Sequence, residues 1–116
     1  MSTAFTVDSA RIRDSLGLVT LSGEVDIYTA PRLKEHMLEL FDAGVCDMIV
    51  DLSEVTFIDS TALGVLIGGI RRVGDAGGTM ALVVATRPVE RILAVTGLDQ
   101  VFTIHETRDD ALAGLS

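Results

Sequence analysis

Ser60 is the residue of this chain whose neighbours in the sequence point most clearly to chemistry. It follows the strand-like segment 55–58 and Asp59, and it precedes Thr61 and an apolar helical segment, so we expect its hydroxyl at a strand-to-helix turn. No histidine or lysine stands near Ser60 to activate that hydroxyl as a nucleophile. The amide end of a helix, by contrast, tolerates an anion such as a phosphate group. These residue types favour a modified regulatory serine over a catalytic one.

A purely structural role is the main alternative for this turn. Asp59 or Ser60 could serve only as the helix N-cap, where a side-chain oxygen accepts a hydrogen bond from a backbone N–H of the first turn and contributes about 1 kcal/mol. The residues of the turn alone leave both roles open.

The helix after Ser60 has an unusual composition for an exposed element. Its core face is predicted to hold Leu63, Leu66, Ile67 and Ile70, and its opposite face Thr61, Val65, Gly68, Gly69 and Arg72. An exposed face is normally charged and polar, and a glycine inside a helix costs up to about 1 kcal/mol relative to alanine. Close approach of another surface would explain the glycines. For Gly64 that surface could be the protein's own sheet, whereas Gly68 and Val65 favour a partner.

A phosphate on Ser60 would change the surface more than the fold. It would add about −2 charge beside Asp59 and next to the small residues of the helix. A partner docked there would meet like-charge repulsion and a desolvation cost. We therefore expect modification of Ser60 to release a bound partner.

The elements that must position Ser60 alternate regularly along the chain. Strands are expected at 5–12, 16–21, 48–52, 80–85 and 101–104, the first two as an antiparallel pair. Helices are expected from Pro31 to before Gly44, from Asp59 to the glycines at 74 and 77–78, from Thr86 to near Gly97, and after a capping box at 107–110.

This order, β-β-α-β-α-β-α-β-α, indicates the α/β class and a single domain over residues 1–116. Strands joined through a helix should be parallel. We therefore expect a mostly parallel mixed sheet with an antiparallel N-terminal strand pair and about four helices. The functional loops of such sheets gather at the carboxyl ends of the strands, and Ser60 follows one of those ends.

Composition narrows the function further. Nine Lys and Arg against seventeen Asp and Glu give a net charge of −8, and no basic stripe is visible, so direct binding to DNA or RNA is not expected. The longest apolar run, 62–70, is well short of the ~20 residues that cross a bilayer. No signal-peptide pattern opens the chain, and a lone Cys46 fits a reducing compartment. We expect a cytoplasmic protein without membrane insertion.

Together these residues give the chain a family resemblance: it is similar to the STAS-domain anti-sigma factor antagonists, the bacterial partner-switching family. The most specific element is segment 57–64, Phe-Ile-Asp-Ser-Thr-Ala-Leu-Gly, and segments 23–26, 51–52 and 97–98 support it. The resemblance implies that Ser60 is phosphorylated by an anti-sigma factor that is itself a serine kinase. It also implies that the unphosphorylated form binds this kinase and frees a sigma factor, and that a serine phosphatase resets the switch.

The resemblance also implies a partner-binding surface. It places Glu24 and Asp26 in a loop near Ser60, although these acidic residues could equally only cap or orient a turn. The expected partner-binding residues are Glu24, Asp26, Asp59, Ser60, Thr61, Val65, Gly68 and Arg72. Two positions depart mildly from the family pattern, because Ala62 stands where glycine is common and Thr61 where serine is common. Thr61 is therefore a second candidate for phosphorylation.

Enzymatic alternatives find little support in the sequence. Ser60 lacks the Gly-x-Ser-x-Gly surroundings of a hydrolase, and neither His36 nor His105 is placed by a motif. Neither a Walker motif nor a Gly-x-Gly-x-x-Gly loop occurs, and the acidic residues of segment 47–54 lack metal-ligand spacing. We expect no catalytic residue, no cofactor and no metal.

A different binding function remains as the alternative. The chain could be a STAS module that is never phosphorylated, for example an accessory subunit of a membrane transporter. The same docking face would serve both functions. Phosphate on Ser60 or Thr61 after incubation with the cognate kinase distinguishes them.

Overall fold

The elements follow the predicted order in the computed structural model of the chain, which describes residues 4–115. The strands are β1 Thr6–Arg13, β2 Leu16–Val25, β3 Asp47–Ile58, β4 Met80–Val83 and β5 Thr103–His105. The helices are α1 Ala30–Asp42, α2 Ser60–Asp75, α3 Arg87–Thr96 and α4 Arg108–Gly114, with a short 3₁₀ helix η1 at Leu98–Gln100.

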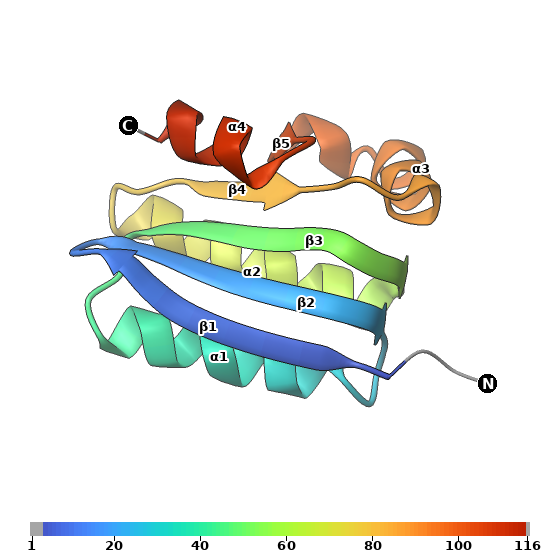
Figure 1. Cartoon of the computed structure of the whole chain (residues 1–116), viewed down its shortest axis with the longest axis horizontal. Coiled ribbons are helices and arrows are strands. Elements are labelled where there is room, and N and C mark those ends of the chain that lie inside the picture. The colour runs from blue at the N-terminus through green and yellow to red at the C-terminus, as the bar shows by residue number, and fades with distance from the viewer. Residues whose placement is uncertain (1–3, 116) are drawn as a thin grey trace.

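The strands form one five-stranded sheet whose order in space follows the order in the sequence (Figure 1). β1 and β2 are antiparallel, and every later neighbour is parallel because a helix carries the chain back to the starting edge. The predicted α/β fold, with a mixed sheet, an antiparallel N-terminal pair and four helices, is confirmed. That residues 1–116 make up a single domain stays a prediction, since 1–3 and 116 lie outside the described residues.

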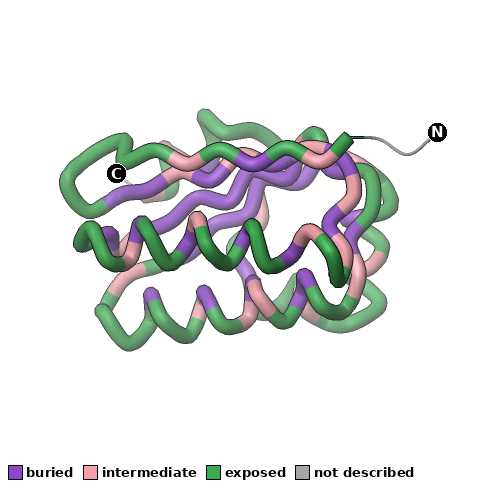
Figure 2. The backbone as a smooth tube through the Cα atoms, turned by 90° about the horizontal axis from the view of Figure 1, so that it is seen from below, coloured by how far each residue is buried: buried purple, intermediate pink, exposed green. Residues whose placement is uncertain are grey.

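Helices cover both faces of the sheet. α1 and α2 lie side by side on one face, and α4 lies on the other (Figure 1). The larger core joins Leu33 of α1, Leu66 of α2 and Leu93 of α3 to the inward residues of the strands. A smaller core under α4 contains Ile49 and Ala111. Buried residues accordingly line the sheet and the sides of α1 and α2 that face it (Figure 2).

β3 is longer than the sequence pattern predicts. The predicted strand 48–52 and the segment 55–58 belong to one strand, because β2 extends to Val25 and pairs with β3 as far as Ile58. Two register shifts along this pair accommodate the extra residues of β3. The long pairing carries the end of β3, and with it Ser60, to the same edge of the sheet as the end of β2.

The end of α2 also differs from the prediction. Gly74 does not end the helix, which continues to Asp75. The turn to β4 is made at Gly77, whose φ of +79° lies in the left-handed region where glycine avoids the steric cost of a Cβ atom.

The strands β4 and β5 are shorter than the predicted segments 80–85 and 101–104. β5 begins only at Thr103 because the N–H groups of Val101 and Phe102 both donate to the carbonyl of Leu98, each at 3.0 Å. These bonds close the 3₁₀ turn of η1 and withdraw the two residues from the sheet.

Candidate functional site

Ser60 is the first residue of α2, and its side chain is exposed. The helix is capped by the residue before it, because Asp59 Oδ1 accepts the N–H of Ala62 at 3.1 Å. Of the two cap candidates in the sequence, Asp59 holds the position. The hydroxyl of Ser60 is therefore free of a capping role and lies where the positive end of the helix dipole favours a negative group.

The turn at Ser60 lies against the end of β2. The N–H of Asp59 donates to the carbonyl of Val25 at 3.1 Å. Asp26 directly follows Val25 in the chain, and Ser60 directly follows Asp59. The loop after β2 and the start of α2 therefore lie side by side and form one continuous surface.

Asp26 orients the turn that leads from β2 into α1. Its Oδ1 accepts the N–H groups of Tyr28 at 2.9 Å and Thr29 at 3.1 Å. Thr29 Oγ1 in turn accepts the N–H of Asp26 at 2.8 Å and donates to the carbonyl of Glu24 at 3.1 Å. The orienting role that the sequence left open for Asp26 is therefore present, and these hydrogen bonds position the loop beside Ser60.

Glu24 lies in β2 and not in a loop, which corrects the expectation from the sequence. It pairs with Phe57 of β3, three residues before Ser60, and its side chain is half-buried. Strand pairing thus brings Glu24 to the same carboxyl edge as Ser60, Asp26 and Asp59.

The other predicted partner-binding residues line one groove between two helices. Thr61, Val65, Gly68 and Arg72 of α2 face Lys34, Met37, Leu38 and Phe41 of α1 across a space of about 350 Å³. The glycines in the sequence of α2 predicted that this helix contributes to the groove. The sequence did not predict the contribution of α1, because the residue pattern of one helix does not show which helix packs beside it.

The glycines of α2 divide differently from the prediction. Gly69 is buried and does not belong to the exposed face, since a Cβ atom there would collide with the terminal methyl groups of Met37 and Met80. Gly64 and Gly68 are exposed, and a Cβ atom on either would meet nothing within 4 Å. Packing inside the protein, against α1 and β4, therefore explains Gly69 but neither Gly64 nor Gly68.

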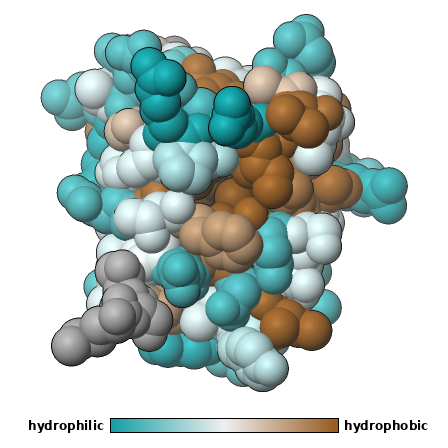
Figure 3. Space-filling model, turned by 90° about the vertical axis from the view of Figure 1, so that its right-hand side faces the viewer, coloured by the Kyte–Doolittle hydropathy of each residue, from teal (hydrophilic) through white to brown (hydrophobic). Residues whose placement is uncertain are grey.

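Large apolar side chains at the carboxyl edge were missed by the sequence reasoning. Tyr28 is 85% exposed, Val95 80% and Phe57 46%. Figure 3 looks onto this end of the molecule and shows apolar side chains gathered over it. Phe57 and Val95 also line a groove between β3 and α3. The sequence feature that could have indicated this patch is the apolar pair Ile27-Tyr28 in an otherwise polar turn. Exposed apolar patches of this kind mark interaction surfaces.

The histidines do not serve Ser60. Nδ1 of His36 lies 2.7 Å from Ser9 Oγ, which ties α1 to β1, and His105 belongs to β5.

Among residues 4–115, no three His, Cys, Asp or Glu side chains are grouped as a metal site would require. Over the same range, none of the helices has the length and apolar character needed to cross a bilayer.

Comparison with known proteins gives the family. The STAS domain model matches residues 9–111. The chain is 35% identical to the anti-sigma-B factor antagonist of Bacillus subtilis, covering 74% of this chain and 78% of that one. It is 34% identical to the anti-sigma F factor antagonist of Paenibacillus polymyxa, covering 84% and 85%. The crystal structure of an anti-sigma factor antagonist from Mycobacterium paratuberculosis superposes with a TM-score of 0.87 at 29% identity, covering 99% and 98%.

These relatives are named for antagonism of a regulatory protein, which is a binding activity. The five-stranded mixed sheet of the chain agrees with that likeness. The chain belongs to the STAS-domain family of anti-sigma factor antagonists and is a regulatory binding protein, not an enzyme.

Proposed function

We propose that this protein binds an anti-sigma factor when Ser60 is unphosphorylated, so that a sigma factor is released, and that phosphorylation of Ser60 ends the binding. The anti-sigma factor is itself the serine kinase, and a serine phosphatase restores the binding form. The observation that supports this most directly is the exposed Ser60 hydroxyl on a helix that Asp59 already caps. Such a hydroxyl can be modified without removing a bond that the fold needs.

The modification itself is a phosphoryl transfer from ATP bound to the kinase. The bond between the γ-phosphorus and the β,γ-bridging oxygen breaks, a bond to Ser60 Oγ forms, ADP leaves, and a base of the kinase takes the hydroxyl proton. Thr61 is exposed beside Ser60 and is the second candidate acceptor.

The electrostatics of the carboxyl edge support a charge switch. Glu24, Asp26 and Asp59 already make this edge acidic, so the facing surface of the partner should be basic or polar. A phosphate adds about −2 charge next to Asp59, on a surface that must lose water when the partner docks. Repulsion and desolvation act together against the complex, while the helix dipole tolerates the phosphate in the free protein.

The direct test is to incubate the purified protein with the kinase-type anti-sigma factor of the same genome and ATP. Mass spectrometry is expected to locate one phosphate on Ser60, and a Ser60→Ala variant to remain unmodified. Phosphate on neither Ser60 nor Thr61 would overturn the switch and leave a STAS subunit that binds without modification.

Truncating Tyr28 is expected to weaken binding of the anti-sigma factor without loss of stability. An exposed aromatic anchor in a docking surface typically contributes tenfold or more, so we expect Tyr28→Ala to raise the Kd about tenfold. Because Tyr28 is 85% exposed, its truncation should change the free energy of unfolding by less than about 0.5 kcal/mol.

Ile12→Ala is the matched control for Tyr28→Ala. Ile12 is also an exposed apolar residue, but it lies beside the turn between β1 and β2, at the opposite edge of the sheet. Titration calorimetry measures the Kd of both variants for the anti-sigma factor. An equal loss of affinity in the two variants would show that Tyr28 does not belong to the docking surface.

A further inference from the structure

The groove between α1 and α2 has an apolar floor and a charge pattern that differs from the rest of the molecule. Met37 and Phe41 of α1 and Val65 of α2 supply the apolar lining. Lys34 and Arg72 also line it, and no acidic residue does. In a chain with a net charge of −8, a groove lined by two cations and no carboxylate is an exception.

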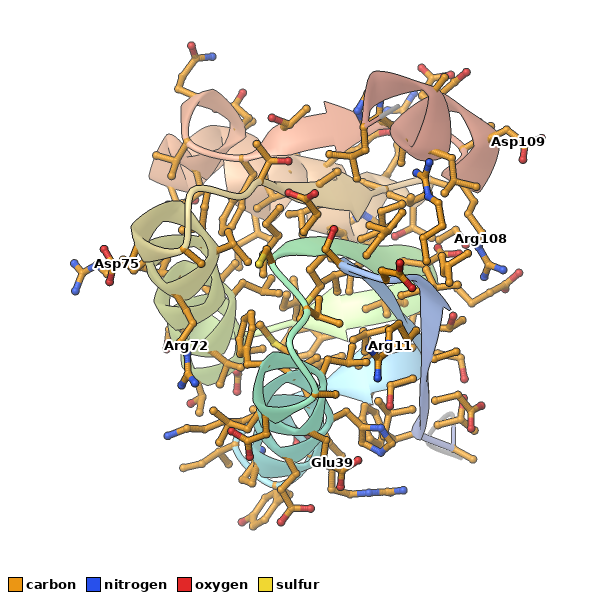
Figure 4. The ribbon with its side chains drawn as sticks, turned by 90° about the vertical axis from the view of Figure 1, so that its left-hand side faces the viewer. Arg11, Glu39, Arg72, Asp75, Arg108 and Asp109 are labelled. Atoms are coloured by element: carbon orange, nitrogen blue, oxygen red, sulfur yellow. The ribbon has the colours of Figure 1, made fainter. Side chains whose placement is uncertain are left out.

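Arg72 is held in position on the α2 side of this groove. Its guanidinium carbon lies 5.0 Å from the centre of the Phe41 ring, a cation–π distance. Figure 4 shows Arg72 reaching from α2 toward α1, whereas Glu39 and Asp75 point away from the space between the two helices. Among the described residues, neither Lys34 nor Arg72 has an acidic partner within ion-pair distance. Both cations can therefore take a carboxylate from outside.

The shape of the groove admits a long partner element. Thr61 and Arg72 mark its two ends on α2, and eleven steps along the helix at about 1.5 Å each separate them by roughly 16 Å, or three turns. Gly64 and Gly68 lie between these ends and leave open space above their backbone. This geometry suits an amphipathic helix laid along the groove.

We propose that the groove between α1 and α2 receives an amphipathic helix of the anti-sigma factor, with apolar side chains entering between the helices and carboxylates pairing with Lys34 and Arg72. The inference rests on the proposed function and extends it, because it assigns α1 to the docking surface and states the chemistry of the element that docks. Ser60, at the start of α2, is the site of the switch. The groove adds partner contacts farther along α2, toward Arg72. A basic partner surface at Ser60 and an acidic helix at the groove together fix the orientation of the complex.

Charge reversal on each wall of the groove tests the pairing, with the purified kinase-type anti-sigma factor of the same genome as the probe. Arg72→Glu and Lys34→Glu are each expected to raise the Kd about tenfold or more, because repulsion replaces attraction. The matched control is Arg71→Glu on α2, an exposed arginine next to Arg72 that lies outside the groove lining. This control should change the Kd less than about threefold, and raising the salt from about 0.05 to about 0.5 M should shrink the groove effects.

A steric pair tests the same groove without changing charge. Gly68→Leu places a side chain in the groove, whereas Gly74→Leu makes the same change on α2 outside the groove lining, and neither Cβ meets an atom within 4 Å. Both changes replace glycine with a better helix former, so neither should lower the melting temperature. Gly68→Leu is expected to raise the Kd about thirtyfold, as blocked apolar contacts do, and Gly74→Leu by less than about twofold.

The outcomes separate this inference from the proposed function. If the wild type binds the anti-sigma factor tightly and the groove variants bind as well as the controls, the groove is not the docking site. That result overturns the inference and leaves the proposed function standing. Failure of the wild type to bind overturns both. If the groove variants instead change only the oligomeric state in size-exclusion chromatography, the occupant is a second copy of this chain and the inference is wrong.

Discussion

Ser60→Asp is expected to weaken binding of the anti-sigma factor by more than about 100-fold, while the melting temperature stays nearly unchanged. The new carboxylate lies beside Asp59 on a surface that loses water on docking, so charge repulsion and desolvation add. Stability is preserved because the N-cap bond from Ala62 N–H to Asp59 remains and the helix dipole favours an acidic residue in the first turn. Titration calorimetry and thermal unfolding on the same preparation measure both quantities.

Ser60→Ala is the companion variant, and it should bind the anti-sigma factor with the affinity of the unphosphorylated wild type. It should also keep that affinity after incubation with ATP, whereas the wild type loses it. Equal affinities for the alanine and aspartate variants would contradict the charge switch, whatever their absolute values.

Arg108→Gln is expected to lower the free energy of unfolding by about 2–3 kcal/mol at pH 7. Asp51 lies in β3 on the face covered by α4, with only 5% of its side chain exposed. Its Oδ2 accepts from Arg108 Nε at 3.0 Å and from Nη2 at 2.8 Å. Glutamine cannot reproduce this charged contact, so the buried carboxylate loses its cationic partner and keeps only the hydrogen bonding from Ser53. Chemical denaturation of both proteins measures the difference.

The same pair predicts a pH dependence. Burial by itself raises the pKa of Asp51, but hydrogen bonds from Ser53 together with Arg108 outweigh it and hold the pKa below its ordinary value. A carboxyl group whose pKa is lower in the folded state than in the unfolded state stabilises the fold. This stabilisation is complete above the pKa of the unfolded state, about 3.9, and it is lost as the pH falls through the pKa of the folded state. The stability gap between wild type and Arg108→Gln should therefore be constant near neutrality and shrink below about pH 4.

The double variant Asp51→Asn with Arg108→Gln is the control for this assignment. Removing the buried charge together with its partner should recover part of the lost stability, because the uncompensated carboxylate is gone. Helix propensity does not account for the loss, since removing a cation from the first turn of α4 is slightly favourable to the helix dipole. A gap that persists unchanged at acidic pH would show that the ion pair is not its cause.

Local signals in the sequence determined the order of the elements and the position of the candidate switch. Hydrophobic periodicity, together with turn and cap residues, predicted the order of the strands and helices, because a side chain that faces a core repeats with the period of its own element. Cap residues marked Asp59 and Thr107 as helix starts, and both accept the expected backbone N–H. Ser60 at the carboxyl end of a parallel strand followed from the same order.

Contacts between distant segments decided the rest, and no local pattern contains them. Whether Glu24 lies in a loop or a strand depends on pairing with Phe57, thirty-three positions along the chain. Gly69 is buried because Met37 and Met80 arrive from α1 and β4, while Gly68 beside it stays open. The groove with Lys34 and Arg72 exists only because α1 and α2 cover neighbouring strands of one face. The sequence by itself determined where Ser60 stands in the fold, whereas long-range packing determined which side chains surround it, since packing depends on segments that meet only when the whole sheet has formed.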